Sequence, residues 1–153
     1  LTSMGNVFSK ILVPIDGSSA SFNASKYAID LARTNDAELI ALHVIYPTYD
    51  QYQAALSPRP EKLQELTSKE MEQRQAYVDK VKQQAAEKKL SVKTDIIVGI
   101  TSVVKEIVEY AEDNNVDIIV VGSRGMTGFK RMLLGSVASD IVTYAHCPVL
   151  VVK

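Results

Sequence analysis

The stretch DIIVVGSRG, Asp117–Gly125, joins an apolar run to a glycine-rich loop. Its first part, Asp117–Val121, is β-branched and does not alternate with polar residues, which is typical of a strand buried on both faces of a sheet. Its second part opens the segment GSRGMTGFKRMLLGSVASDI, Gly122–Ile141, which carries four glycines. Folding needs only one or two glycines at such a turn, so the surplus indicates a loop that a ligand approaches closely.

Four further runs have the same apolar, β-branched character: Ile11–Ile15, Glu38–Ile45, Thr94–Val98 and Val149–Val152. Apolar residues recur at helical spacing between these runs, as expected of helices that pack on a sheet. The stripes are Ala24, Ala28 and Leu31; Met71, Val78, Val81 and Ala85; Val104, Ile107, Val108 and Ala111; and Ala138, Ile141, Val142 and Ala145. This alternation predicts right-handed βαβ units and a doubly wound α/β fold with a parallel sheet.

The length of 153 residues fits one domain. We expect residues 1–9 to form a tail, with Leu1–Ser3 vector-derived ahead of a native start at Met4, and residues 10–153 to form the domain. The polar, proline-rich segment Pro47–Pro60 predicts a surface loop.

Composition excludes some classes of function. A net charge of −1 does not suit a general nucleic-acid binder, which needs a basic surplus. No apolar run is long enough, at about 20 residues, to predict a membrane span. Cys147 is the single cysteine, so no internal disulfide is possible, and this fits a cytoplasmic protein.

Two loops are predicted at the carboxyl ends of the strands, where doubly wound sheets bind ligands. One is Pro14–Ser19, and the other follows Gly122. We expect Gly122 and Gly125 to let the chain turn sharply, with positive φ or close backbone approach, so that amides point inward. The helix opened by Gly135 and Ser136 would then offer its N-terminus to an anion.

The alternatives are an ordinary helix start and a different loop chemistry. Ser136 would equally serve as an N-cap that binds a backbone amide. The loop is not a Walker A motif, because it lacks the Gly-Lys-Ser/Thr ending, and it is not a dinucleotide fingerprint. Arg124, Lys130 and Arg131 either add positive charge to the loop or are solvated.

The spacing Gly122-x2-Gly125-x9-Gly135-Ser136 resembles the nucleotide-binding signature of the universal stress protein family. The segments SKILVPIDGSSAS, HVIYP, DIIVVGSRG and CPVLVVK resemble four of that family's strands with their turns. The resemblance implies a five-stranded parallel sheet in the order 3-2-1-4-5 with helices on both faces, as in adenine nucleotide alpha hydrolase-like folds. It also implies membership of the ATP-binding subclass.

The resemblance assigns site residues position by position. Asp16 matches an acidic residue near the ribose and is a possible ligand, through water, of Mg²⁺ or Mn²⁺. Val44 matches an apolar residue of the adenine pocket. The other implied nucleotide-binding residues are Pro14, Ile15, Gly99, Ile100, Gly122, Arg124, Gly125, Gly135, Ser136 and Val137.

Several of these residues have a plain structural interpretation as well. Asp16 precedes a glycine, and Asp-Gly is a common turn pair. His43 is either a catalytic base or, without a recognisable nucleophile beside it, a structural histidine. Tyr46, Tyr49 and Tyr52 either cover the pocket by stacking on a base or pack within their loop. His146 and Cys147 are interpreted as connector residues.

Two functions remain open on the sequence: a nucleotide-dependent stress-response switch that acts on an unknown protein partner, and an enzyme that slowly hydrolyses ATP. No catalytic residue is assigned. A flavin carrier is less consistent with the sequence, because no Ser/Thr-type phosphate loop follows the first strand. The resemblance further implies a homodimer through the edge strand Val149–Val152.

Overall fold

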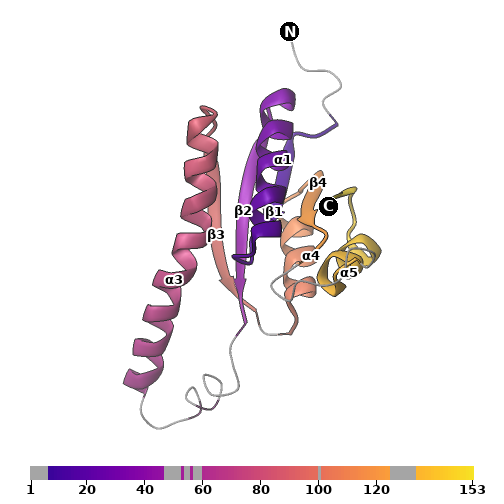
Figure 1. Ribbon diagram of the computed structural model, residues 1–153. Coiled ribbons are helices and arrows are strands. Elements are labelled where there is room, and N and C mark those ends of the chain that lie inside the picture. The colour runs from indigo at the N-terminus through magenta and orange to yellow at the C-terminus, as the bar shows by residue number, and fades with distance from the viewer. Residues whose placement is uncertain (1–6, 47–52, 54–55, 57–59, 100, 125–133) are drawn as a thin grey trace.

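The computed structural model describes residues 7–46, 53, 56, 60–99, 101–124 and 134–153, with no side chains described for 60–67. Strands and helices alternate along the chain (Figure 1). The strands are β1 (Lys10–Pro14), β2 (Glu38–Ile45), β3 (Val92–Val98), β4 (Ile118–Gly122) and β5 (Val149–Val152). The helices are α1 (Ser19–Asn35), α3 (Pro60–Glu87), α4 (Val103–Asp113) and α5 (Ser136–Tyr144).

The five strands form one sheet in the order β3-β2-β1-β4-β5, and every neighbouring pair is parallel. The predicted fold class and strand order are therefore confirmed. The chain leaves β1 first toward β2 and β3, and later crosses to β4 and β5, so the strand order reverses beside β1. A parallel sheet of this kind leaves a crevice at the carboxyl ends of the strands on either side of that reversal.

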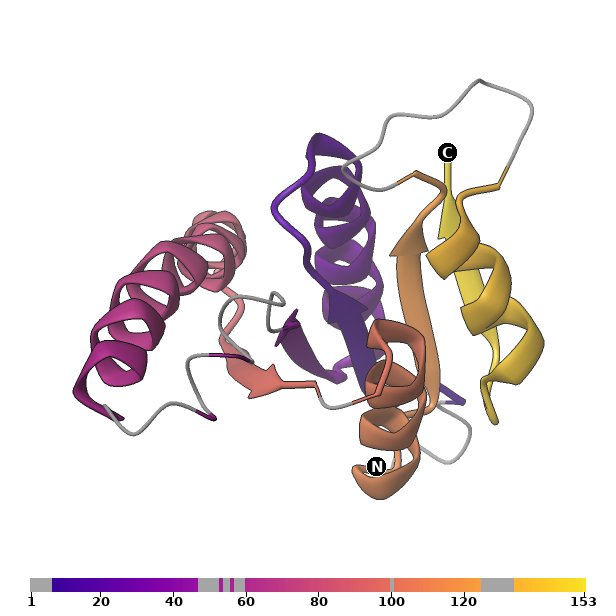
Figure 2. The ribbon, with the colours of Figure 1, turned by 90° about the horizontal axis from the view of Figure 1, so that it is seen from below.

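Helices cover both faces of the sheet, with α1 and α3 on one face and α4 and α5 on the other (Figure 2). Alternate residues of β1 serve the two cores: Ile11 and Val13 pack under α1 and α3, and Leu12 packs under α4 and α5. The small residues Ala24, Ala28 and Ala32 are fully buried along α1, and they let this helix lie close to the strands.

Two residues of the predicted helical stripes do not face the core. Met71 of α3 and Val142 of α5 are 41% and 48% exposed. Both are wrong predictions, because helical spacing alone does not say how wide a stripe the neighbouring elements cover. The predicted loop 47–60 lies mostly outside the described residues, and its last residue, Pro60, begins α3.

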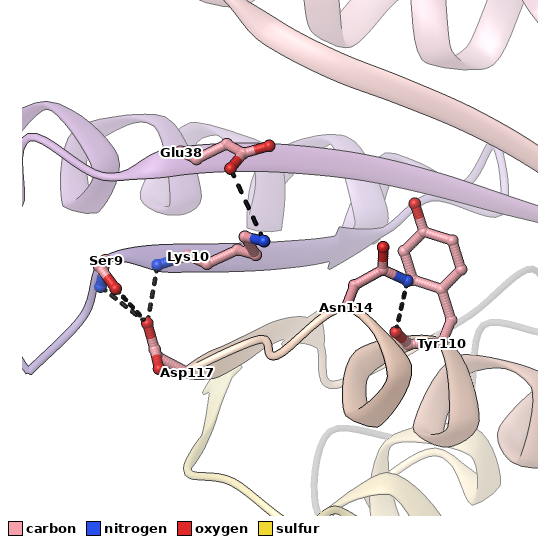
Figure 3. Close-up of polar contacts among 6 residues, drawn as sticks. All are labelled: Ser9, Lys10, Glu38, Tyr110, Asn114 and Asp117. Carbon is pink, nitrogen blue, oxygen red and sulfur yellow. Dashed lines mark hydrogen bonds and ion pairs between the residues drawn. The ribbon is translucent and has the colours of Figure 1, made fainter.

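Polar side chains close the amino-terminal end of the sheet (Figure 3). The Oδ2 atom of Asp117 accepts hydrogen bonds from the Ser9 amide at 2.9 Å, the Ser9 hydroxyl at 2.7 Å and the Lys10 amide at 2.9 Å. Burial raises the pKa of Asp117, but these hydrogen bonds outweigh it, so the pKa lies below its usual value. The cluster ties the start of β1 to the start of β4.

In the described part of the chain, no helix combines the length and the apolar character that crossing a bilayer requires.

Candidate functional site

A cavity of about 410 Å³ opens at the carboxyl ends of β1, β2 and β4. It lies beside the reversal in strand order, as expected for this fold. Its walls come from the loop after β1, the end of β2, the first residues of α4 and α5, and one side chain of α3. The volume is within the range of pockets that hold small molecules.

Most of the site residues inferred from sequence lie together around this cavity. Those that line it are Pro14, Ile15, Asp16, Val44, Gly122, Arg124, Gly135, Ser136 and Val137. Gly99 does not line it but lies behind Val44 and Tyr46, since a Cβ atom built there would be 3.2 Å from Val44 Cγ1. Ile100, Gly125, Lys130 and Arg131 lie outside the described residues.

One wall of the cavity is apolar. Val44 at the end of β2 faces it together with Val103 and Ile107 of α4. Neither of these α4 residues was predicted as a site residue, because Ile107 was assigned to a core-facing helical stripe and Val103 was not singled out. Apolar side chains that approach from two elements suit a flat, uncharged ring.

The first turn of α5 forms another wall of the cavity. Its N-cap is Gly135, which has no side chain to accept a hydrogen bond from the helix, and the first i→i−4 bond runs from the Ser139 amide to the Gly135 carbonyl at 2.9 Å. The amides of Ser136, Val137 and Ala138 therefore precede the helical hydrogen bonds, and all three residues line the cavity. Ser136 is the first helical residue, so its interpretation as an N-cap is wrong.

Two amides of the preceding loop are already occupied. The Gly135 amide donates to the Ser123 carbonyl at 2.7 Å, and the Ser123 amide donates to the Val152 carbonyl at 2.8 Å. Within the described residues, the first turn of α5 therefore supplies donors to an anion in the cavity, and the Arg124 side chain lies at the cavity wall as well.

Gly122 has a different role from the one expected. Its φ is not positive, and a Cβ atom there would lie 2.9 Å from the Ala20 carbonyl oxygen of α1. Gly122 therefore lets the end of β4 pack closely against the start of α1. Among the described glycines, positive φ occurs at Gly17, where φ is 88°.

Asp16 is both a turn residue and a cavity residue. Its Oδ1 atom accepts hydrogen bonds from the Ser18 amide at 2.9 Å and from the Ser18 hydroxyl. The same hydroxyl accepts from the Ser21 amide at 3.1 Å and so caps α1. The turn fixes the direction of the carboxylate, and the residue lines the cavity.

His43 lines the cavity but is only 2% exposed. Its Nδ1 atom lies 2.6 Å from the Ile15 carbonyl, and its Nε2 atom lies 3.4 Å from Arg74 Nη1. Since a carbonyl only accepts and a guanidinium only donates, the ring is neutral, with its proton on Nδ1. Burial lowers the pKa of His43 and favours this form. Both nitrogens are engaged, which agrees with the structural interpretation rather than with a base.

Arg74 and Tyr46 also line the cavity. Arg74 was not predicted as a site residue, because the charges of the α3 segment were interpreted as a solvated helix face. The one local sign in the sequence is its i,i+4 spacing to Glu70, with which Arg74 forms an ion pair at 3.1 Å. Tyr46 donates its hydroxyl hydrogen to the Thr101 carbonyl. The other two tyrosines considered as a cover, Tyr49 and Tyr52, lie outside the described residues.

Comparison with known proteins identifies the family. The model of the "Universal stress protein family" matches residues 8–153. This chain belongs to the universal stress protein family. It is 39% identical to the universal stress protein MJ0531 of Methanocaldococcus jannaschii over 148 residues, which cover 97% of this chain and 84% of that protein.

Solved structures of this universal stress protein's relatives agree with its fold. Protein MJ0577 of Methanocaldococcus jannaschii is 35% identical, with a TM-score of 0.79 and 96% of both chains covered. A family protein from Arabidopsis thaliana, solved with AMP bound, is 20% identical, with a TM-score of 0.67 and 95% and 91% of the two chains covered. At that identity the second likeness concerns the fold alone.

Proposed function

We propose that this universal stress protein binds ATP in the cavity and acts as a cytoplasmic, nucleotide-dependent switch in the stress response. The observation that carries the proposal is the glycine-capped N-terminus of α5, which faces the same cavity as an apolar wall and a carboxylate. The positive end of a helix dipole and its unpaired amides together favour a phosphate group.

The three parts of the cavity match the three parts of a nucleotide. The adenine ring packs against Val44, Val103 and Ile107, the ribose hydroxyls donate to Asp16, and the phosphates meet the first turn of α5. Arg124 adds positive charge on the phosphate side. The protein from Arabidopsis thaliana that shares this fold was solved with AMP bound, so AMP is among the nucleotides to be tested.

A divalent cation enters this proposal together with the phosphates. No group of three or more carboxylate, histidine or cysteine side chains gathers to hold a metal ion among the described residues. Mg²⁺ is commonly held by one or two carboxylates, water and the phosphates of its nucleotide. Asp16 fits that requirement through water, with its Oδ2 side, so Mg²⁺ or Mn²⁺ would arrive bound to ATP.

Binding rather than hydrolysis is the activity we propose. The candidate base, His43, has both ring nitrogens engaged. A switch requires only that ATP change the population of two states. Helix α5 begins at the cavity and contacts the edge strand β5, so a ligand that shifts its first turn would also alter the surface offered to a partner.

The exposed edge strand β5, beside α5, is the surface through which we propose that two copies of the chain pair. β5 is an edge strand of the sheet, and Leu150 on β5 and Tyr144 on α5 are 38% and 68% exposed. Apolar edge strands favour pairing with a second copy. Replacement of Leu150 by Glu is expected to give monomers in sedimentation experiments; a dimer that persists unchanged contradicts this interface.

Isothermal titration calorimetry with ATP, ADP and AMP, each with and without Mg²⁺, tests the proposed function. We expect the strongest binding for ATP with Mg²⁺. Mass spectrometry of small molecules that co-purify with the protein identifies a ligand without assuming one. Absence of heat with all three nucleotides, together with no co-purified nucleotide, contradicts the proposal.

A further inference from the structure

The ring of Tyr77 on α3 packs against the loop that carries Asp16. Gly17 adopts φ 88°, and a Cβ atom on it would lie 2.5 Å from Tyr77 Cζ and 2.8 Å from two further ring carbons. The ring therefore lies directly on the Gly17 backbone. Only glycine fits, because any side chain there would meet both the ring and an unfavourable φ.

The residue on the other side of Asp16 is held as well. The Ile15 carbonyl accepts from His43 Nδ1 at 2.6 Å, and the His43 ring packs edge-on against Tyr77 with centroids 5.4 Å apart. Arg74 completes the group: its guanidinium lies 3.4 Å from His43 Nε2 and 5.7 Å from the Tyr77 ring centroid. Glu70, one turn earlier on α3, fixes the guanidinium at 3.1 Å.

We infer that Tyr77 and His43 are positioning residues that hold the Asp16 carboxylate in place for recognition of a ribose. They act on the backbone at Gly17 and at Ile15, the two neighbours of Asp16, and the Ser18 amide then orients Oδ1. The inference rests on the proposed function, because it gives Asp16 a ribose to recognise.

A rigid carboxylate discriminates between sugars. A site built to accept hydrogen bonds from ribose hydroxyls rejects an analogue without them, because the carboxylate is left without its partners. If the loop shifts, this preference falls while the contacts to base and phosphates persist. The measurable consequence is the ratio of affinities for ATP and 2′,3′-dideoxy-ATP, which overall destabilisation does not change.

Calorimetry with ATP and 2′,3′-dideoxy-ATP tests this ratio in four proteins. We expect the wild type to prefer ATP by roughly tenfold or more, as for hydrogen bonds to a charged group. Tyr77→Leu should bring the ratio close to one, and Tyr77→Phe, which keeps the ring on Gly17, should restore most of it. Val81→Ala is the matched control, since Val81 is fully buried on the same helix one turn farther from the loop. The inference is overturned if Tyr77→Leu keeps the wild-type ratio, or if the wild type binds both nucleotides equally.

Hydrogen exchange of the ligand-free protein separates this inference from the proposed function. The Ser18 amide donates to Asp16 at 2.9 Å, so it reports on the turn without any nucleotide. Tyr77→Leu should speed its exchange by about tenfold more than Val81→Ala does, because the latter opens the loop only through overall unfolding. If the wild type binds no nucleotide, the proposed function fails, and equal exchange in the two variants overturns the positioning role.

Discussion

At the amino-terminal ends of the strands polar groups satisfy one another, whereas at the carboxyl ends the first turn of α5 offers its amides to a cavity. Asp117 collects three hydrogen bonds from Ser9 and Lys10 (Figure 3). Gly135, in contrast, gives its helix no side-chain cap. Both ends belong to the same five strands, so the difference lies in the loops. At one end the polar groups are paired within the protein, and at the other the amides that precede the helical hydrogen bonds line a cavity.

The N-caps of α1, α4 and α5 differ in the same way, because two of them are serines that accept a hydrogen bond and the third is a glycine. Ser18 caps α1 by accepting from the Ser21 amide, and Ser102 caps α4 by accepting from the Lys105 amide, each at 3.1 Å. A serine cap is worth about 1 kcal/mol relative to alanine, but only about a few tenths of a kcal/mol relative to glycine. The α5 helix lacks such a cap, and its first turn lines the cavity beside Arg124. At the capped start of α4, it is the apolar residue Val103 that lines the cavity.

We expect the largest effect at the carboxyl end of the sheet, where β4 packs closely against α1. Gly122→Ala places a Cβ atom 2.9 Å from a backbone oxygen of α1, so β4 or α1 must move, at a cost of about 2–3 kcal/mol in the free energy of unfolding. Gly99→Ala is the control, because its Cβ would meet only side chains, the nearest at 3.1 Å. Urea denaturation measures both. Equal losses would show that the contact with Ala20 is easily relieved.

We expect the next largest effect at the amino-terminal end of the sheet, where a substitution should change the stability of the protein and not its affinity for ATP. Asp117→Ala removes the acceptor of three hydrogen bonds and is expected to cost about 1–2 kcal/mol, given its partial exposure. ATP affinity should stay unchanged. Because the folded pKa of Asp117 is depressed, its contribution is present above the unfolded pKa of about 4 and is lost as pH falls through the folded value. Asp113→Ala, an exposed carboxylate four residues earlier, is the control. A weaker nucleotide affinity in Asp117→Ala would mean that the two ends are coupled.

At the carboxyl end of the sheet, we expect removal of a backbone amide from α5 to weaken ATP binding without changing stability. Ser136→Pro removes one amide from the first helical position of α5, where proline is tolerated, and the extended Gly135, with φ −57° and ψ 152°, permits a following proline. We expect ATP affinity to fall about tenfold, as for loss of a hydrogen bond to a charged group, with little change in stability. Ser136→Ala separates the hydroxyl from the amide.

Ser19→Pro makes the equivalent change at the first position of α1, whose start is capped by Ser18. Its ATP affinity should equal that of the wild type. If both proline variants bind ATP as the wild type does, the α5 amides are not the phosphate donors.

Sequence patterns predicted the fold more fully than the site. The alternation of apolar runs and helical stripes indicated a doubly wound sheet, and the family resemblance supplied the strand order. Asp16 and Val44, near the ends of β1 and β2, and Ser136, at the start of α5, were assigned by the family resemblance, and all three line the cavity. Arg74, Val103 and Ile107 reach it only through packing of helices, and no local pattern records that.

The glycines show a second limit. A sequence reveals that Cβ is absent but not what fills the space. At Gly122 the neighbour is the backbone of α1, at Gly17 it is the Tyr77 ring, and at Gly135 it is the Ser123 carbonyl at 3.1 Å. Surplus glycine in the Gly122 loop therefore serves packing as well as any ligand.

We expect the smallest effect for His43, whose two ring nitrogens contact the Ile15 carbonyl and Arg74 beside the cavity. Its pKa is lowered by burial, so the stability it provides is fully present above the unfolded pKa of about 6.5 and is lost as pH falls through the folded value. Burial sets this direction and the cation Arg74 lowers the pKa further, while the hydrogen bond to the Ile15 carbonyl and the carboxylates of Asp16 and Glu70 raise it. Urea denaturation from pH 7 to pH 5 should show His43→Asn, whose amide can still donate to Ile15, losing less stability than the wild type. Parallel losses in the two proteins would mean that protonation of His43 does not disturb its contact with Arg74, and that the support beneath Asp16 does not depend on pH.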